Sequence, residues 1–311
     1  MAIPAAAGYP QYSGNLINPL FSMELVALFY CATVYSEIST TDYNGDLNRY
    51  GDQITFFREP EIVVHSYEKG GNLISTPISS EAVTMTIDRA KYFNVPIDDI
   101  DRKQIQTWGA LENAILRRGA YNLATQIDTE LLAEMFADAS PDNAGTTAGV
   151  KSHSYNLGVT GNPVPITSAN VIQTLSYAEA VLEEQCAIGG QTPFIVFPKV
   201  AKPAFLNSDL KNWFITHNDT TILNGRVPNQ VMGFNVYFSN FVPQVFDVGA
   251  NALCYDIPFG VPNATAFALQ LQESKVIDNP NSFGQFYRAL NVYGFKVLQN
   301  KGIGALYARF N

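Results

Sequence analysis

The longest uninterrupted pattern of hydrophobic positions in the chain lies between residues 83 and 139, where a strand pattern leads directly into a helical one. β-branched and aromatic residues dominate 83–97, which is typical of a strand. Pro96 cannot donate a hydrogen bond to a neighbouring strand, so it indicates an edge strand or a bulge. We expect this stretch to lie at the edge of a sheet, immediately before a helix.

The helical pattern begins near Asp101 and continues without a proline as far as Pro141. Asp101 and Gln104 have the spacing of a capping box, in which each side chain can accept or donate at the first turn. Ser140-Pro141-Asp142 is a suitable stop. The pattern therefore predicts one helix of about 35 residues, or about 50 Å at 1.5 Å per residue.

The hydrophobic stripe of this helix changes face near Gly119. Its first half carries Ile105, Trp108, Leu111 and Ile115, and its second half carries Leu116, Leu123, Ile127, Leu131 and Met135, which step mostly by four. Such a helix can contact one domain with one face and a second domain with the rotated face. Periodicity alone leaves open a single long helix on an ordinary α/β core.

Two strand-like runs precede this region and predict a long hairpin with a Gly-Gly tip. The first run is 52–66, with Gln53–Phe57 and Ile62–Val64, and the second is 74–86. They are joined by Tyr67, Glu68, Lys69, Gly70, Gly71 and Asn72. A hairpin of this length is marginal in water unless one face packs on something. No helix separates its strands, so we expect its support to come from another subunit.

The rest of the chain alternates short strands with short helices. In order, the pattern predicts an extended arm over 1–19, a loop or weak hairpin over 141–165, a helix through 171–186 capped by Thr167 or Ser168 and ended by Gly189-Gly190, a buried strand at 194–197, a brief helix within 198–206, and strands at 233–240, 252–257, 266–276 and 283–298. The last two could return the chain to the sheet that begins at Val83. The fold class is therefore α+β with discontinuous domains.

Composition limits the classes of function. The chain has 311 residues, of which 47% are hydrophobic and 15% charged, so two domains are expected. The 28 acidic and 19 basic residues give a formal charge of -9 without any Lys/Arg run, which excludes a broad basic face for nucleic acid. About 25% charged residues is usual for a globular protein. The deficit suggests that neighbouring subunits cover much of the surface.

Neither cysteine pattern nor hydropathy indicates secretion or a membrane. Cys31, Cys186 and Cys254 are widely spaced and lack a CxxC pair, so neither a disulfide framework nor a zinc site is expected, and a reducing cytoplasm fits. The apolar run 20–34 is too short to span a bilayer and is interrupted by Glu24. No targeting segment is visible in the sequence.

The densest group of candidate ligands is Asp88, Asp98, Asp99 and Asp101. An oxygen-rich metal site is one interpretation, but a strand end followed by a helix N-terminus explains the carboxylates more simply. His65, His153 and His217 are scattered, and the chain has no HExxH, GxSxG or P-loop pattern. We therefore expect no enzymatic activity, no cofactor and no metal.

Five segments occur in an order that resembles one protein family. They are Gly51–Phe57 with Tyr67–Gly70, Val83–Asp88 with Phe93–Gln104, Phe194–Pro198, Leu223–Asn240 and Phe286–Val297. In this order they resemble the major capsid (coat) proteins of tailed bacteriophages, which share the capsid fold first described in a Hong Kong phage. The resemblance covers nearly everything after residue 50. No single segment is specific, because each is a strand with a glycine, but the ordered set is.

The resemblance implies a division of the chain and a structural function. Residues 1–51 would be the N-arm, 52–82 the extended hairpin called the E-loop, 83–140 with 256–311 the peripheral domain, and 141–255 the axial domain. The protein would form hexamers and pentamers of an icosahedral head shell, assembled in the bacterial cytoplasm, that encloses double-stranded DNA without binding it specifically. The E-loop tip, 67–72, would contact a neighbouring subunit. The family's fused N-terminal scaffolding segment is not visible, which implies a separate scaffold protein or none; scaffold, portal and decoration proteins would be possible partners.

The resemblance also raises finer hypotheses and leaves alternatives. Some shells of this family join a hairpin lysine to a neighbour's asparagine, which would give Lys69 a cross-linking role; a solvated charge that discourages edge pairing is the simpler interpretation. Arg117 and Arg118 could touch DNA or a scaffold, or form a solvated helix face near Glu112. An encapsulin-like compartment and an unrelated α+β binding protein remain alternative functions.

Overall fold

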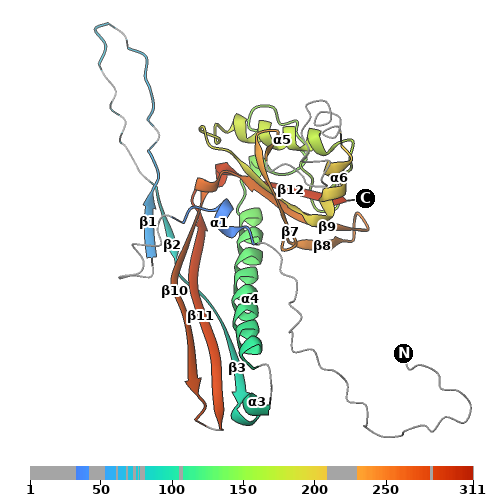
Figure 1. Ribbon diagram of the computed structural model, residues 1–311. Coiled ribbons are helices and arrows are strands. Elements are labelled where there is room, and N and C mark those ends of the chain that lie inside the picture. Colours follow the sequence, from blue (N-terminus) through green and yellow to red (C-terminus); the bar gives the residue numbers. More distant parts are fainter. Residues whose placement is uncertain are drawn as a thin grey trace, which may run out of the picture.

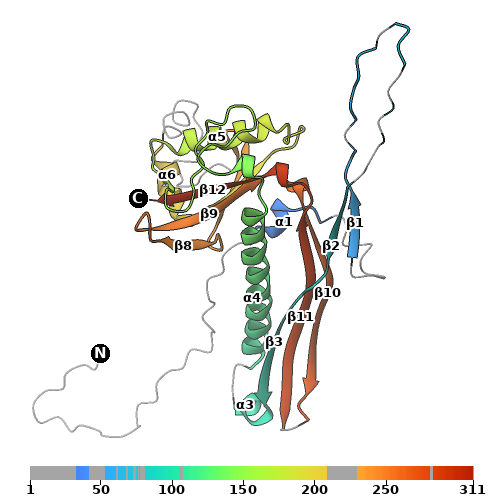
Figure 2. The ribbon, with the colours of Figure 1, turned by 180° about the vertical axis from the view of Figure 1, so that it is seen from behind.

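The computed structural model describes residues 33–41, 53–60, 62–67, 69–72, 75, 77, 81–104, 108–208, 230–280 and 283–310. Within these ranges the strands form sheets of two, three and seven strands. A long helix runs alongside the three-stranded sheet, and the seven-stranded sheet lies at one end of that helix (Figures 1 and 2). The predicted α+β class is confirmed.

The three-stranded sheet is antiparallel in the order β10-β11-β3. Its strands are β3 (Arg89–Asp98), β10 (Thr265–Asp278) and β11 (Gly284–Val297). β11 pairs with β3 from Gly284 opposite Asp98 to Tyr293 opposite Arg89. The expected return of the chain to this sheet is thus confirmed. Pro96 lies on the edge strand β3, as its missing N–H requires.

The single strand predicted over 83–97 is wrong in one respect, because the structure divides it in two. β2 (Ala82–Thr86) pairs only with β1, whereas β3 begins at Arg89 and pairs with β11. The chain changes partners at residues 87 and 88, where Gly294 of β11 crosses it closely. A Cβ on Gly294 would lie 2.5 Å from the carbonyl oxygen of Thr86.

The long helical pattern contains α3 (Asp99–Gln104) and α4 (Trp108–Ala137). The predicted start at Asp101 is wrong. α3 begins two residues earlier, because Asp98 rather than Asp101 caps it: the Asp98 Oδ1 accepts a hydrogen bond from the N–H of Ile100 at 2.8 Å. The predicted end is close to the observed one, since α4 stops at Ala137 just before Pro141.

The hydrophobic stripe of α4 changes face along the helix, and α4 contacts a different sheet with each face, as predicted. Its first half packs on the three-stranded sheet, where Gly119 allows the ring of Phe93 to approach: a Cβ on Gly119 would lie 2.4 Å from the Phe93 Cε1. Its second half enters the main core with Leu123, Ile127, Leu131, Leu132 and Met135, all buried. α4 contacts β3 and β11 of one sheet and β9 and β12 of the other. The bridging interpretation is therefore confirmed.

The seven-stranded sheet has the order β4-β12-β9-β5-β7-β6, with β8 paired to β9. Its strands are β4 (Val164–Ile166), β5 (Phe194–Pro198), β6 (Gln230–Val231), β7 (Phe234–Ser239), β8 (Gln244–Asp247), β9 (Ala252–Gly260) and β12 (Ile303–Phe310). All five residues of β5 are buried, as its continuous apolar run predicts. β5 and β7 are parallel, as are β4 and β12.

Short helices connect these strands. They are α5 (Val171–Glu184), α6 (Lys202–Leu206) and the 3-10 turns η1 (Pro141–Asn143), η2 (Lys199–Ala201), η3 (Pro262–Ala264) and η4 (Asn300–Gly302). α5 starts after Asn170 rather than after a Thr167 or Ser168 side-chain cap; Thr167 contributes its carbonyl oxygen to Val171 N–H at 3.1 Å. None of the described helices is long and apolar enough to span a membrane.

The end of the chain does not follow the predicted division. The range 256–311 was expected to form part of the domain that contains α4 and β3. Instead, β12 leaves β11 and pairs with β9 and β4 in the seven-stranded sheet, while β10 and β11 stay in the three-stranded sheet. β12 was missed because 303–310 is a short apolar run that a helix or a strand could contain.

Candidate assembly interface

The hairpin predicted to contact a neighbour begins as a two-stranded ribbon. β1 (Gln53–Phe57) pairs antiparallel with β2, from Gln53 opposite Thr86 to Phe57 opposite Ala82. Beyond the ribbon, the described residues project away from both larger sheets (Figures 1 and 2). The expected strand at Ile62–Val64 is wrong, because these residues are not paired in a sheet.

The base of the hairpin is fixed to the rest of the subunit. The Arg58 guanidinium bonds Glu81 across the ribbon at 3.1 Å and donates to the carbonyl oxygen of Leu298 from Nε at 3.0 Å and from Nη2 at 2.6 Å. Met85 and Ile87 form a small buried cluster with residues of β10. The direction of the hairpin is therefore set at its base.

The outer part exposes large apolar side chains. Ile62 is 71% exposed and Val64 is 91% exposed, and Phe57, Val63 and Tyr67 are also exposed. Contiguous exposed apolar residues on a soluble protein mark a surface that another molecule covers. At the tip, Lys69, Gly70, Gly71 and Asn72 are all exposed, while Glu68 lies outside the described residues. Gly70 has a φ of +90°, a conformation that glycine adopts without strain.

A second exposed apolar surface lies where α4 meets the seven-stranded sheet. It is a groove of about 940 Å³ between the end of α4, the 158–161 loop and β8, lined by Phe136, Val159, Phe246 and Val248 among others. Asp256 also lines it, and burial raises the pKa of this carboxyl group to about 6. Asp247 shapes the rim, because its carboxylate accepts hydrogen bonds from the N–H of Gly249 at 2.9 Å and the Tyr307 hydroxyl at 3.0 Å.

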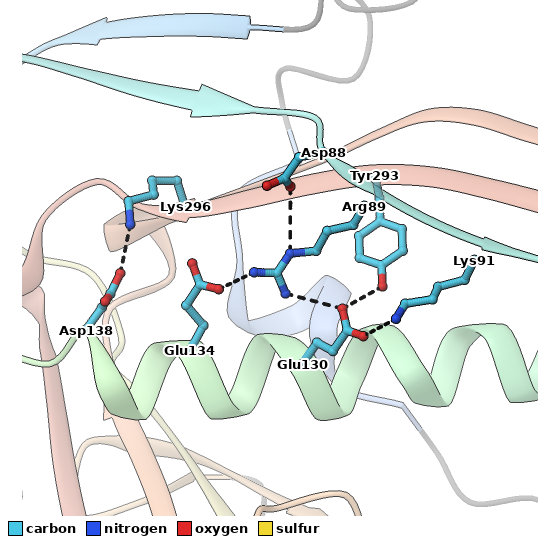
Figure 3. A network of polar contacts seen from close by, with 8 residues as sticks. All are labelled: Asp88, Arg89, Lys91, Glu130, Glu134, Asp138, Tyr293 and Lys296. Atoms are coloured by element: carbon cyan, nitrogen blue, oxygen red, sulfur yellow. Dashed lines mark hydrogen bonds and ion pairs between the residues drawn. The ribbon is translucent and has the colours of Figure 1, made fainter.

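A polar network holds the three-stranded sheet against α4 (Figure 3). Arg89 of β3 lies between Glu130 and Glu134 on successive turns of α4, at 3.2 Å from Glu130 and in close contact with Glu134. Lys91 approaches Glu130 at 2.7 Å, and the Tyr293 hydroxyl donates to Glu130 at 2.9 Å. Each carboxylate therefore has a cation beside it. Such a network of ion pairs stabilises the packing of the sheet on α4 and does not resemble a catalytic acid–base pair.

The charge state of Glu130 follows from these partners. Burial raises the pKa of Glu130, but the hydrogen bonds from Lys91, Tyr293 and Arg89 and the charge of Lys91 outweigh it, so the pKa lies below its ordinary value. The same carboxylate, together with burial, raises the pKa of Tyr293. Sequence reasoning missed this network. The sequence feature that could have revealed it is a pair of acidic residues on one helix face, Glu130 and Glu134, together with a pair of basic residues on one strand face, Arg89 and Lys91.

The structure separates most of the polar residues that the sequence singled out. Asp98 caps α3, Asp88 lies 3.8 Å from the Arg89 Nε, and Asp99 and Asp101 are exposed in the first turn of α3. His65 is exposed on the hairpin. His153 lies in the loop before β4, and His217 is outside the described residues. Among the residues that the structure describes, no group of three His, Cys, Asp or Glu side chains could hold a metal ion.

A family model described as phage capsid protein matches residues 80–306. The chain belongs to this family. It is a structural capsid protein that self-assembles into the phage head shell, so its place is in the virion. A search of curated protein sequences finds no match. The family match favours a phage shell over an encapsulin-like compartment or an unrelated binding protein.

Solved capsid structures share the fold of this capsid protein. A chain of Mycobacterium phage Che8 superposes with a TM-score of 0.72 at 21% identity, covering 96% of this chain and 98% of that one. The bacteriophage PhiM1 mature capsid gives 0.65 at 14% identity, with 94% and 91% covered. Gordonia phage Cozz gives 0.62 at 14% identity, with 100% and 98% covered. These likenesses show that the chain has the phage capsid fold.

Proposed function

We propose that this capsid protein forms hexamers and pentamers of an icosahedral head that encloses double-stranded DNA, and that the tip of its hairpin is a contact between subunits. The observation that carries the proposal is the hairpin itself. Its base is fixed by Arg58 and Glu81, whereas Ile62, Val63 and Val64 are exposed. Burying such residues in a neighbour stabilises an assembly by about 25 cal/mol per Å².

The remaining parts of the proposal follow from family membership and charge. The shell is assembled in the bacterial cytoplasm with a separate scaffold, portal or decoration protein, and the protein has no catalytic activity. Residues 1–51 act as the N-arm, 52–82 as the E-loop, and the two larger sheets as the cores of the peripheral and axial domains. The net charge of -9 supports enclosure of DNA without specific binding.

Replacing the exposed apolar residues tests the contact. We expect Val63→Ser with Val64→Ser to leave the folding of the subunit unchanged and to slow or abolish shell formation, measured by light scattering and electron microscopy. Val200→Ser, which changes an equally apolar and half-exposed residue away from the hairpin, serves as the control. Normal assembly of the double variant at the wild-type rate would remove the hairpin from the interface.

A denaturing gel of mature particles tests the cross-linking hypothesis for Lys69. An isopeptide bond requires a carboxylate placed to take up the proton of the lysine, and the described residues around the exposed tip supply none. We therefore expect a single band near 34.2 kDa. A ladder of covalent multimers that disappears in Lys69→Arg would establish the bond.

A further inference from the structure

A buried carboxylate on α4 holds the segment that precedes the hairpin. Asp128 is fully buried, and both of its oxygens lie 3.0 Å from the backbone nitrogen of Val34. Its Oδ1 also accepts a hydrogen bond from the N–H of Tyr35 at 2.7 Å. The two partners are separated from Asp128 by 94 and 93 residues. Asp128 therefore joins the start of α1 (Tyr35–Ile38) to the middle of the long helix.

The held segment forms a strap across the subunit. Val34 and Ile38 are buried in the main core, and the ring of Tyr35 lies 5.2 Å from that of Phe267. At the other end of the strap, Thr40 exchanges backbone hydrogen bonds with β10, from its N–H to Thr265 at 2.9 Å and from Phe267 N–H to its carbonyl oxygen at 3.0 Å. The strap, residues 33–41, is thus fastened by a carboxylate at one end and by strand pairing at the other.

The charge on Asp128 is held by backbone N–H groups alone. From α1, the titratable groups are Tyr35, whose pKa burial and Asp128 raise, and Glu37, which lies near Tyr237 of β7. On α4 itself, Glu130 and Glu134 face the sheet, where Arg89 and Lys91 neutralise them (Figure 3). Among the described residues, no cation contributes to the charge state of Asp128. Burial therefore raises its pKa to about 6, against the effect of the two hydrogen bonds.

We propose that Asp128 is the positioning residue for the strap, residues 33–41: it holds the start of α1 on α4, and the strap opens and closes locally about this contact. Two features support local opening. α1 has only four residues, too few to be stable alone. A carboxylate that has no cation beside it is also less favourable buried than exposed.

The proposal has a defined dependence on pH. In the closed state Asp128 binds its proton with a pKa of about 6, and in the open state the exposed carboxyl returns to about 3.8. The closed state therefore holds more protons between these values, so closing is favoured by acid and weakens as pH rises. The opening constant rises about 30-fold from pH 4 to pH 6 and about 60-fold from pH 4 to pH 7, and it levels off above pH 7.

Hydrogen–deuterium exchange of the full chain, read by mass spectrometry on peptides within 33–41, tests the proposal. For the wild type we expect protection of Val34 and Tyr35, corrected for intrinsic exchange, to fall by about 60-fold between pH 4 and pH 7. Asp128→Ala removes the acceptor of both N–H groups and should lower protection in this peptide at least about tenfold at pH 7, with α5 unaffected. Its protection should no longer depend on pH.

Matched variants separate a positioning role from a general structural one. Glu112→Gln alters a carboxylate 16 residues earlier on the same helix and should leave exchange of the strap unchanged. Asp128→Asn keeps an uncharged acceptor oxygen, like the protonated acid, so its protection should not depend on pH and should exceed that of the wild type at pH 7; this variant also serves if Asp128→Ala does not fold. The proposal is overturned if strap protection in the wild type does not change with pH. Protection in Asp128→Asn that falls with pH as in the wild type would overturn it as well, and so would an equal loss of protection in α5 and the strap in Asp128→Ala.

Discussion

At the scale of single residues, the carboxylate of Glu130 joins the three-stranded sheet to the long helix. Its partners keep it ionised although it is partly buried. Glu130 receives hydrogen bonds from Lys91, Arg89 and Tyr293. Its pKa in the folded state lies below the unfolded value, so its stabilisation is fully present above the unfolded pKa. It is lost as pH falls through the folded pKa.

We expect Glu130→Gln to lower the free energy of unfolding of the subunit by about 1–3 kcal/mol at pH 7, because charge-assisted hydrogen bonds to Lys91 and Arg89 are replaced by weaker ones. The difference from wild type should shrink as the pH is lowered below about 4. Urea denaturation of unassembled subunits at several pH values measures it. Glu112→Gln on the same helix is the control. A loss that is equal at all pH values would contradict the assignment.

Individual contacts were the least predictable feature from sequence. Asp98 and Asp101 both fit a helix cap by composition, and only the backbone decides that Asp98 is the residue at the start of α3. The partners Arg89 and Glu130 are 41 residues apart, so their meeting depends on β3 lying along α4. The hydrogen bond from the N–H of Val34 to Asp128 could not be predicted for the same reason. Such contacts require knowledge of which elements are neighbours.

At the scale of elements, the tip of the hairpin combines an exposed position with a backbone conformation that favours glycine. Gly70 has a φ of +90°, and a Cβ there would meet nothing within 4 Å. Substitution with a β-branched residue would therefore strain the backbone without a steric clash in the subunit. The shape of the tip, rather than its packing, is what the change would alter.

We expect Gly70→Val to leave subunit stability within about 0.5 kcal/mol of wild type, as for most exposed sites, and to slow assembly because a misdirected tip fails to reach its neighbour. Thermal unfolding and light-scattering kinetics measure the two effects. Lys69→Val, which adds the same side chain at the adjacent position, is the control for hydrophobicity. Assembly at the wild-type rate by Gly70→Val would show that tip geometry is unimportant.

The crossing of β11 over the junction between β2 and β3 gives a second prediction. A Cβ on Gly294 would lie 2.5 Å from the Thr86 carbonyl oxygen and 2.9 Å from the Ile87 Cα, so backbone atoms must move. We expect Gly294→Ala to destabilise the subunit by about 1–3 kcal/mol, measured by chemical denaturation. Gly109→Ala, in α4 with nothing within 4 Å, should be neutral or stabilising. Equal stability of the two variants would contradict this account of the crossing.

Elements with strong periodicity were predictable, and changes of partner were not. The buried strand β5, the strands β10 and β11 and the long helix follow from their hydrophobic patterns. The break at residues 87 and 88 did not, because both sides of it are strand-like in sequence and only the pairing partners differ. β12 was missed because its place beside β9 depends on long-range pairing.

At the scale of the whole molecule, the net negative charge argues that a shell of this protein does not bind the DNA that we propose it encloses. The net charge of -9 per chain opposes phosphate, with screening beyond about 8 Å at physiological salt. Arg117 and Arg118 on α4 are a local exception, and Arg118 stacks on Tyr121 with its guanidinium 5.1 Å from the ring centroid. Two adjacent arginines supply little of the counterion release that strong binding needs.

We therefore expect empty shells or subunits to show no submicromolar binding to duplex DNA at low salt in a mobility-shift assay. Under the proposed function, we then expect filling of the head with DNA to require an energy-driven motor. Arg117→Ala with Arg118→Ala should leave the result unchanged. Tight binding with a steep salt dependence that the double variant abolishes would mean that these arginines form a DNA-binding surface and that the charge argument is wrong.

The central claim is that the subunit completes its structure only in contact with other copies of itself. The exposed apolar residues of the hairpin and the groove beside α4 are explained by neighbours that cover them. Cryo-electron microscopy of the purified full chain tests this most directly. We predict closed shells of hexamers and pentamers in which residues 62–72 of each subunit lie against an adjacent subunit. Shells in which this hairpin touches only its own subunit, or a monomer at every concentration, would contradict the account.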